Sequence, residues 1–214
     1  MTNSQGFQSD GEYLDMAAKW MRARSARLSV EKELADATER FENGEDDGPR
    51  SQPARQVRCR VTVLKEAEEK LHKELEGRLE VHRGNDRYPL GIDSVCEASR
   101  LSEDERLIIT AVTLSCVGNP VAESTFGSMF SSYSGMQVSD AVQLLGATEP
   151  SDWLKYRRMF LPDSPLVKNR HLVYDRVPQG PDGLMDVTLS VGRETFAVIT
   201  GTELEPESYD DEAE

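Results

Sequence analysis

The sequence has few of the residues and patterns from which metal sites, disulfide frameworks and membrane segments are built. Its 214 residues include 3 cysteines, with no C-x-x-C pair, and 3 histidines that stand far apart. A structural zinc site needs four such ligands at paired spacings, so no metal site is expected. No apolar run approaches the roughly 20 residues that a membrane-spanning helix needs, and the first residues lack the features of a secretory signal. We therefore expect a cytoplasmic protein that holds no metal and contacts no membrane.

Catalytic constellations are equally scarce. The chain has no G-x-x-x-x-G-K-[ST] motif, and no glycine is followed by lysine anywhere, so it lacks the loop that cradles nucleotide phosphates. His171 lies in an alternating segment, where we expect a surface residue rather than a general base. Asp163, Ser164 and Pro165 have the composition of a turn or a helix cap. We predict a protein that is not an enzyme, with no catalytic residues and no cofactor.

Positive charge is also in short supply. Lys and Arg number 25 against 39 Asp and Glu, which gives a formal net charge of −14 at pH 7. Proteins that bind the backbone of nucleic acids need a positive face that displaces counterions. The balance argues against a general nucleic-acid binder, although it allows a local basic patch.

The first third of the chain contains strong helical periodicity. Residues 1–11 are mostly polar and are expected to be disordered. Residues 13–41 contain no Gly or Pro, and their apolar residues recur at steps of three to four, which predicts a long helix. Arg24, Ser25 and Glu31 interrupt its apolar stripe.

A second helix is expected after a flexible acidic connection near residues 43–56, which collects Gly, Pro and acids. It begins at residue 57 or 61 and continues to residue 81, with leucines along one edge and charged residues over the rest. Together the two helices predict a helical hairpin over residues 12–88. The leucine stripe is more typical of the hairpin's own core than of a partner site. Tyr13 and Trp20 lie outside this stripe and are expected to contact another surface.

The pattern changes at residue 89, where short helices begin. Ser102 and Glu105 form a predicted capping box before a run that is apolar almost all round, which indicates a buried helix. The expected elements are helices near 90–98, 103–117, 121–133, 138–145 and 153–160, strands at 171–177 and 184–189, and a closing helix at 192–199. This order is that of a winged helix-turn-helix. We predict a mainly α fold with a small β-hairpin, in which the helical hairpin is followed by a winged helix-turn-helix domain at 89–201 and an acidic tail at 202–214.

Several short motifs carry a resemblance to a known family. The stretches that carry it are YLDMAAKWMRARSARL (13–28), LGIDSVCEASRLSEDERLIITAV (90–112), DSPLVKNRHLV (163–173) and LSVGRETFAVITG (189–201). They resemble the winged-helix domain that precedes the motor module in a group of bacterial AAA+ ATPases. The resemblance implies a Pro-Leu-basic strand in 163–173 and a closing helix that ends at Gly201. In that family an ATPase module follows this glycine, whereas here a short acidic stretch follows, so ATP hydrolysis is not carried over.

The expected recognition helix, residues 138–145, offers little to DNA. A DNA-reading helix presents Lys, Arg, Asn or Gln to the major groove. No Lys or Arg occurs between Arg106 and Lys155, and the one useful donor on this helix is Gln143. Binding to nucleic acid is therefore disfavoured.

Aromatic and basic residues gather instead in residues 153–160. Trp, Tyr and Arg dominate the energetics of protein interfaces, so the partner-binding candidates are Trp153, Tyr156, Arg157 and Arg158, with Trp20 of the hairpin as a second surface. We expect Trp153 and Phe160 to face the core together and both arginines to be exposed.

These features favour a non-catalytic adaptor that recruits a protein partner, either a companion AAA+ ATPase or the substrate of one. Two alternatives stay open at this point. The chain could be a winged-helix regulator that binds DNA, or a fragment of a full-length AAA+ ATPase.

Overall fold

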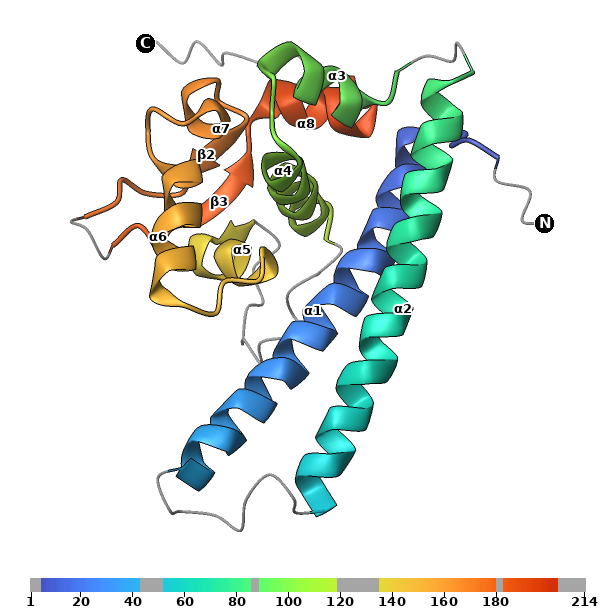
Figure 1. Ribbon diagram of the computed structural model, residues 1–214. Helices are drawn as coiled ribbons and strands as arrows, with labels where there is room; N and C mark the ends of the chain where they lie inside the picture. Colours follow the sequence, from blue (N-terminus) through green and yellow to red (C-terminus); the bar gives the residue numbers. More distant parts are fainter. Residues whose placement is uncertain (1–4, 43–51, 86–88, 119–134, 180–182, 204–214) are drawn as a thin grey trace.

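Two long helices open the computed structural model, which describes residues 5–42, 52–85, 89–118, 135–179 and 183–203. These helices are α1 (Asp10–Glu42) and α2 (Gln52–Arg83), and they pack against each other. Figure 1 shows an antiparallel hairpin whose far end projects beyond the rest of the molecule. Both helices begin earlier than the periodicity indicated.

Short helices form the region after the hairpin. They are α3 (Gly91–Ser99), α4 (Glu103–Cys116), α5 (Val138–Leu144), α6 (Pro150–Arg157), the 3-10 turn η1 (Arg158–Phe160), α7 (Pro165–Lys168) and α8 (Arg193–Thr200). The predicted capping box is confirmed: the Ser102 hydroxyl accepts from the Glu105 N–H at 3.3 Å, and the Glu105 carboxylate accepts from the Ser102 N–H at 2.8 Å. α4 is buried from Arg106 to Leu114, as its apolar pattern predicted.

Three parts of the sequence interpretation lie outside the described residues. They are the expected helix at 121–133, most of the connection near 43–56, and nearly all of the acidic tail.

The sheet has three antiparallel strands rather than two. These are β1 (Met136–Gln137), β2 (Leu172–Tyr174) and β3 (Thr188–Val191), in the order β1-β3-β2. The predicted pairing of the last two strands is confirmed, but both are shorter than expected, and β1 was missed because two residues show no alternation. The strand implied for residues 163–173 begins only at Leu172, since Pro165 starts the helix α7 instead.

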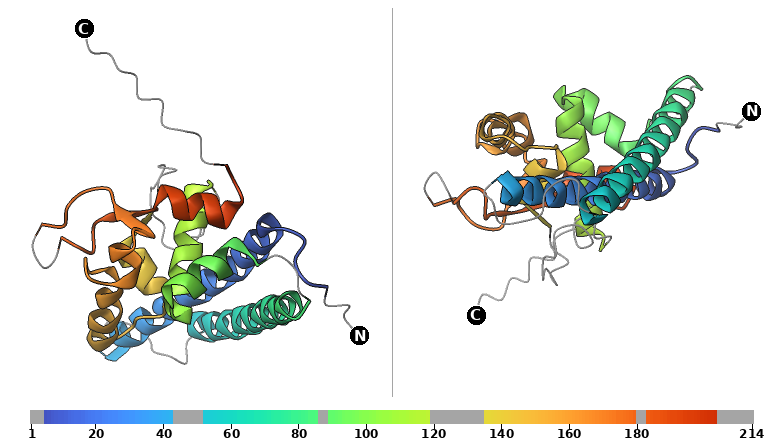
Figure 2. Two further views of the ribbon diagram at one scale, coloured as in Figure 1. Left: turned by 90° about the horizontal axis from the view of Figure 1, so that it is seen from above. Right: turned by 60° about the horizontal axis from the view of Figure 1, so that its bottom comes forward.

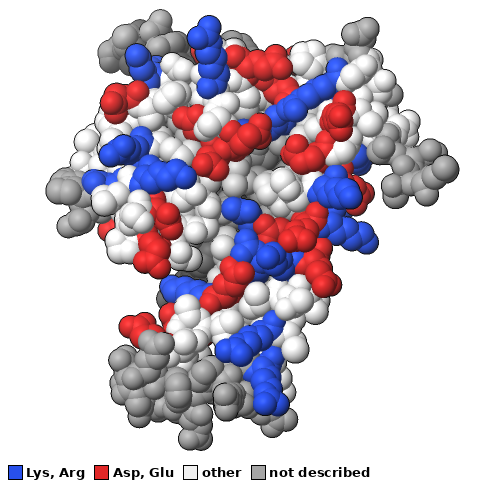
Figure 3. Space-filling model, viewed as in Figure 1, with Lys and Arg blue, Asp and Glu red and all other residues white. Residues whose placement is uncertain are grey.

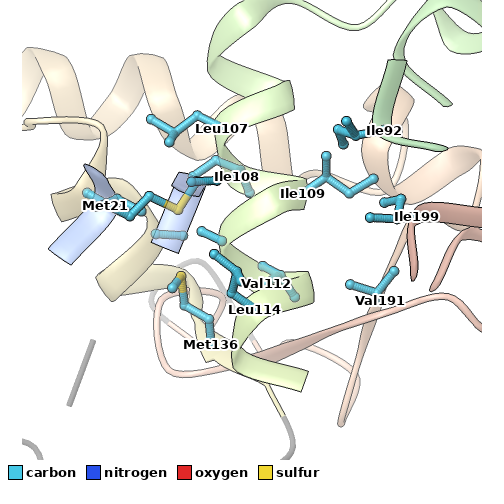
Figure 4. Packing of buried hydrophobic residues seen from close by; sticks show 14 of the residues in the cluster. Met21, Ile92, Leu107, Ile108, Ile109, Val112, Leu114, Met136, Val191 and Ile199 are labelled. Atoms are coloured by element: carbon cyan, nitrogen blue, oxygen red, sulfur yellow. The ribbon is translucent and has the colours of Figure 1, made fainter. Parts of the chain in front are cut away.

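One hydrophobic cluster joins the hairpin to the short helices and the sheet. α1 contacts α2, α4, α5 and α8, and the views in Figure 2 place it between α2 and the remaining elements. Figure 4 shows Met21 of α1 beside Ile108 and Leu107 of α4, while Ile109 lies near Ile92 and Ile199 of α3 and α8. The two expected pieces of the chain therefore share a core.

The segment before α1 differs from the prediction. Phe7 is fully buried, with its ring 5.5 Å from that of Tyr13 in an edge-to-face arrangement and the Arg78 guanidinium 4.3 Å from its centroid. Asp10 accepts a 2.6 Å hydrogen bond from the N–H of Gly91, at the start of α3. The predicted disorder of residues 1–11 is therefore wrong for residues 5–11, because an isolated aromatic in a polar stretch finds its partners on distant helices.

The charged residues that interrupt the α1 stripe form a polar network. Arg24 donates to the Leu144 carbonyl at 2.7 Å and to Glu68 at 3.1 Å, and Arg27 donates to both Glu68 and Glu31. Glu68 is buried, so its two arginine partners are what makes this charge tolerable in the interface. The network ties α1 to α2 and to the C-terminal end of α5.

Candidate functional site

The segment α6–η1 carries four of the five predicted partner-binding residues, and local signals define where it begins. Pro150 occupies the first turn of α6, where its missing N–H costs nothing. Glu149 and Asp152 form a reciprocal capping box, each carboxylate accepting a backbone N–H of the other residue. The helix therefore begins three residues earlier than the aromatic pattern indicated.

The aromatic residues of this segment attach it to the core. Phe160 is fully buried, and its carbonyl accepts a hydrogen bond from the hydroxyl of Tyr174 in β2. Trp153 and Tyr156 are half-buried and pack against the same cluster. Phe160 faces the core as expected. Trp153 was expected to face the core with it and is half-buried, so it does so only in part.

The outer face of α6–η1 differs from the prediction by one residue. Arg158 is exposed as expected, but Arg157 is half-buried and makes contacts of its own, since it lies four residues after Trp153 on the same side of the helix. Leu154 is instead 63% exposed, and Lys155 is exposed beside it. The sequence analysis missed these two residues, although their spacing of three to four from Arg158 places all three on one face.

A shallow hollow of about 350 Å³ adjoins this face. Its lining is Glu105, Arg158, Met159, Leu161, Asp163, Ser164 and Pro165. The hydroxyl of Ser164 is buried and has no hydrogen-bond partner among the described residues. Ser164 directly precedes α7 with an extended backbone, which confirms the predicted turn or cap at 163–165. Apolar groups, one arginine and two carboxylates thus line the hollow, and the Ser164 hydroxyl beside them is buried.

Trp20 belongs to a separate site. Its ring stacks on that of His72 with centroids 4.7 Å apart, and the Arg24 guanidinium lies 6.0 Å from its centroid. Trp20 lines a cleft of about 190 Å³ with residues of α1, α2 and α4, and none of the residues lining that cleft comes from α6 or η1. The structure therefore does not bring the fifth candidate residue together with the other four.

The candidate recognition helix α5 is covered on more than one side. Four of its seven residues are buried, and Ser139, Asp140 and Gln143 are half-buried, so none is exposed. α1 and α6 both pack against α5, and Arg24 donates to the carbonyls at its end. Burial raises the pKa of the Asp140 carboxyl. This helix presents no open face of donors to a DNA groove.

His171 holds three elements together. Its Nδ1 lies 2.9 Å from the Thr195 hydroxyl of α8, and its Nε2 lies 2.6 Å from the Ser99 hydroxyl of α3. Burial lowers the pKa of the imidazole. His171 is half-buried, so the expectation of a surface residue holds only in part, and both ring nitrogens make structural hydrogen bonds.

Metal-binding clusters and membrane-spanning helices are both absent from the part of the chain that the structure describes. Within it, no group of three or more His, Cys, Asp and Glu side chains gathers as a metal site. None of the described helices is both long enough and apolar enough to cross a membrane.

The cysteines are expected to differ sharply in reactivity. Cys59 is exposed on α2, whereas burial raises the pKa of the Cys96 thiol to about 11 and also raises that of Cys116. Because the thiolate is the reactive form, Cys96 is expected to react about a hundredfold more slowly than Cys59 near neutral pH. Mass spectrometry of the folded protein after iodoacetamide pulses measures this order. Equal rates at Cys59 and Cys96 would contradict it, and denatured protein is the control.

Comparison with known proteins extends over nearly the whole chain. A family model described as "Winged helix domain, variant" matches residues 2–211. No curated protein and no solved structure matches the chain. The matched region includes α1 and α2 together with the short helices and the sheet, and nothing in it links the chain to AAA+ ATPases.

Proposed function

The chain belongs to the family of variant winged helix domains, and from this premise we propose that it is a non-catalytic adaptor that binds a protein partner. The observation that carries the proposal is the burial of α5. In DNA-binding winged helices this element reads the major groove. Here α1 and α6 pack against α5, so the surface that binds a partner is expected on another element.

The α6–η1 face supports binding of a protein. Leu154, Lys155 and Arg158 are exposed, and Arg158 borders the hollow that contains the unpartnered Ser164 hydroxyl. Cationic groups beside an apolar side chain suit a partner with acidic and apolar residues. Figure 3 shows both signs of charge interspersed over the visible face. The chain as a whole has a formal net charge of −14, so neighbouring exposed cations stand out against it.

The partner that the proposal favours is an AAA+ ATPase or the substrate of one. The support for this class of partner is the resemblance of the short motifs to the domain that precedes such motors. The lack of a Gly-Lys pair in the chain agrees with a companion protein supplying the nucleotide chemistry.

Charge reversal on α6–η1 tests the proposal. Lys155→Glu with Arg158→Glu is expected to weaken partner binding at least about tenfold, because two favourable cations become two repulsive anions. Lys19→Glu with Lys73→Glu makes the same change in net charge at exposed positions of the hairpin and serves as the control. We expect the parent and the control to capture a partner that the α6–η1 variant does not. Quantitative proteomics identifies this partner, and titration with the purified partner measures its affinity. Equal binding by all three proteins would move the interface away from α6–η1.

The competing function makes an opposite prediction. A DNA-binding regulator would select one duplex site from a random library, with a preference of at least about a thousandfold over other sequences. Such a selection at physiological salt would favour the regulator over the adaptor.

A further inference from the structure

The projecting half of the hairpin lacks a core. Among the described side chains, none of residues 31–40 in α1 and none of residues 55–67 in α2 is buried, and Val30 is the last buried residue on α1. Toward the other end of α2, Leu75 and Leu79 are 2% exposed and belong to the hydrophobic cluster that includes residues of α1 and α4. Two helices alone cannot enclose their apolar residues, so the far half presents them to the surface.

A groove of about 530 Å³ runs between the two helices in this half. It is lined by Ala26, Ser29, Val30, Glu33, Cys59, Arg60, Val63 and Leu64. Val63 is 63% exposed, and Leu64 is half-buried. A helix laid along such a groove would cover both apolar side chains.

The charges on the two helices of this half are opposite in sign. Residues 31–40 of α1 carry four acidic and two basic side chains, whereas residues 55–65 of α2 carry four basic and no acidic ones. In Figure 3 the basic side chains lie over the projecting end of α2. Within one copy, Arg60 and Glu33 approach to 3.8 Å, but both are more than half exposed, so this pair contributes little on its own.

This arrangement is self-complementary. In a two-fold contact the same patch meets itself, so α1 of one copy lies against α2 of the other and the reverse contact occurs as well. The acidic stretch then faces the basic stretch twice, and Val63 of each copy enters the other copy's groove. We propose that the projecting half of the hairpin is a self-association surface, and that two copies of this chain form a four-helix bundle there.

The dimer is weak and reversible. Residues 55–65 extend about 16 Å at 1.5 Å per residue. An interface of that length is expected to bury no more than about 1,200 Å² in total, which is the small end of the range for stable interfaces. Apolar burial supplies the affinity, and the charges select the orientation of the helices.

Sedimentation equilibrium of the purified chain tests this proposal from about 1 μM to about 1 mM, the range of weak association. The parent chain is expected to pass from monomer to dimer as its concentration rises. Val63→Glu places a carboxylate in the groove and is expected to remain monomeric throughout. Val177→Glu, at a valine that is 83% exposed outside the hairpin, is the matched control and is expected to dimerise like the parent.

A charge exchange provides a second, independent variant. Arg60→Glu is expected to weaken the dimer about tenfold or more, since it places a negative charge against the acidic stretch of the other copy and the two-fold axis repeats that repulsion. Adding Glu33→Arg to it restores the pairing with the signs reversed and is expected to restore the mass. Circular dichroism verifies that every variant keeps its helices. A parent chain that stays monomeric at every concentration overturns the proposal, as does a Val63→Glu variant that dimerises normally. The measurement uses no second protein, so its failure would leave the adaptor function of α6–η1 standing, and failure of the adaptor function would not alter these masses.

Discussion

Asp93→Ala is expected to lower the free energy of unfolding by about 3 to 5 kcal/mol, the cost of removing one partner from a buried ion pair. Asp93 is 4% exposed, and its carboxylate accepts a 2.7 Å hydrogen bond from Arg83 of α2 and forms a 2.7 Å ion pair with Arg106 of α4. Arg106 is itself 8% exposed, and its guanidinium lies 5.8 Å from the ring centroid of Tyr13, so little of its charge is hydrated. Without Asp93 the Arg106 charge would remain buried and uncompensated.

Urea unfolding followed by circular dichroism measures this loss. Glu97→Ala is the matched control, because Glu97 lies on the same helix, α3, but is exposed. We expect it to change the free energy of unfolding by less than about 0.5 kcal/mol, as surface substitutions usually do. If Asp93→Ala and Glu97→Ala had equal effects, the carboxylate would not be holding α2, α3 and α4 together.

Gly91→Ala is expected to destabilise the fold by about 3 kcal/mol or more, the upper range for overpacking. A Cβ at this position would lie 1.9 Å from the Val198 carbonyl oxygen and 2.9 Å from the Ile199 Cα, both of which are backbone atoms of α8. Neither atom can move without displacing the helix, so α3 and α8 would have to separate. The same displacement would strain the hydrogen bond from the Gly91 N–H to Asp10.

Gly77 provides the opposite result from the same substitution. A Cβ there meets nothing within 4 Å, and the residue lies inside α2. Gly77→Ala is therefore expected to stabilise the protein by about 0.5 to 1 kcal/mol through the better helix propensity of alanine. Thermal melts of the two variants should move in opposite directions. A Gly91→Ala protein that melts with the parent would show that α3 and α8 do not pack as closely as described.

Several elements were predictable because their signals are local. The Ser102–Glu105 capping box and the all-round apolar run that follows it identified α4. The helix expected at 192–199 is α8, and its end at Gly201, which has the left-handed φ of 66°, was implied by the resemblance. The chain order of these elements was enough to predict a winged helix.

The candidate site was predictable only in part. The helix expected at 153–160 is confirmed as α6 and η1, whereas the partner-binding role of its residues stays a prediction. Composition did not predict which side of this segment is exposed. Leu154 was not named among the exposed residues, and Arg157 was expected to be exposed but is half-buried. Their places depend on which side of α6 meets the core, and that is set by contacts with other parts of the chain, where Tyr174 donates to the Phe160 carbonyl and α5 packs against α6.

The sequence by itself determined where most of the described helices lie and how α4 is capped, because these signals come from residues within a few positions of one another. The negative charge follows from composition alone. Only the tertiary structure decided that Arg24 reaches the end of α5, 120 residues away, that Asp10 caps α3, and that α5 is enclosed. Such contacts join residues whose separation leaves no periodic trace in the chain. The proposal of a protein partner rests on the burial of α5, and that burial arises from packing rather than from any local pattern.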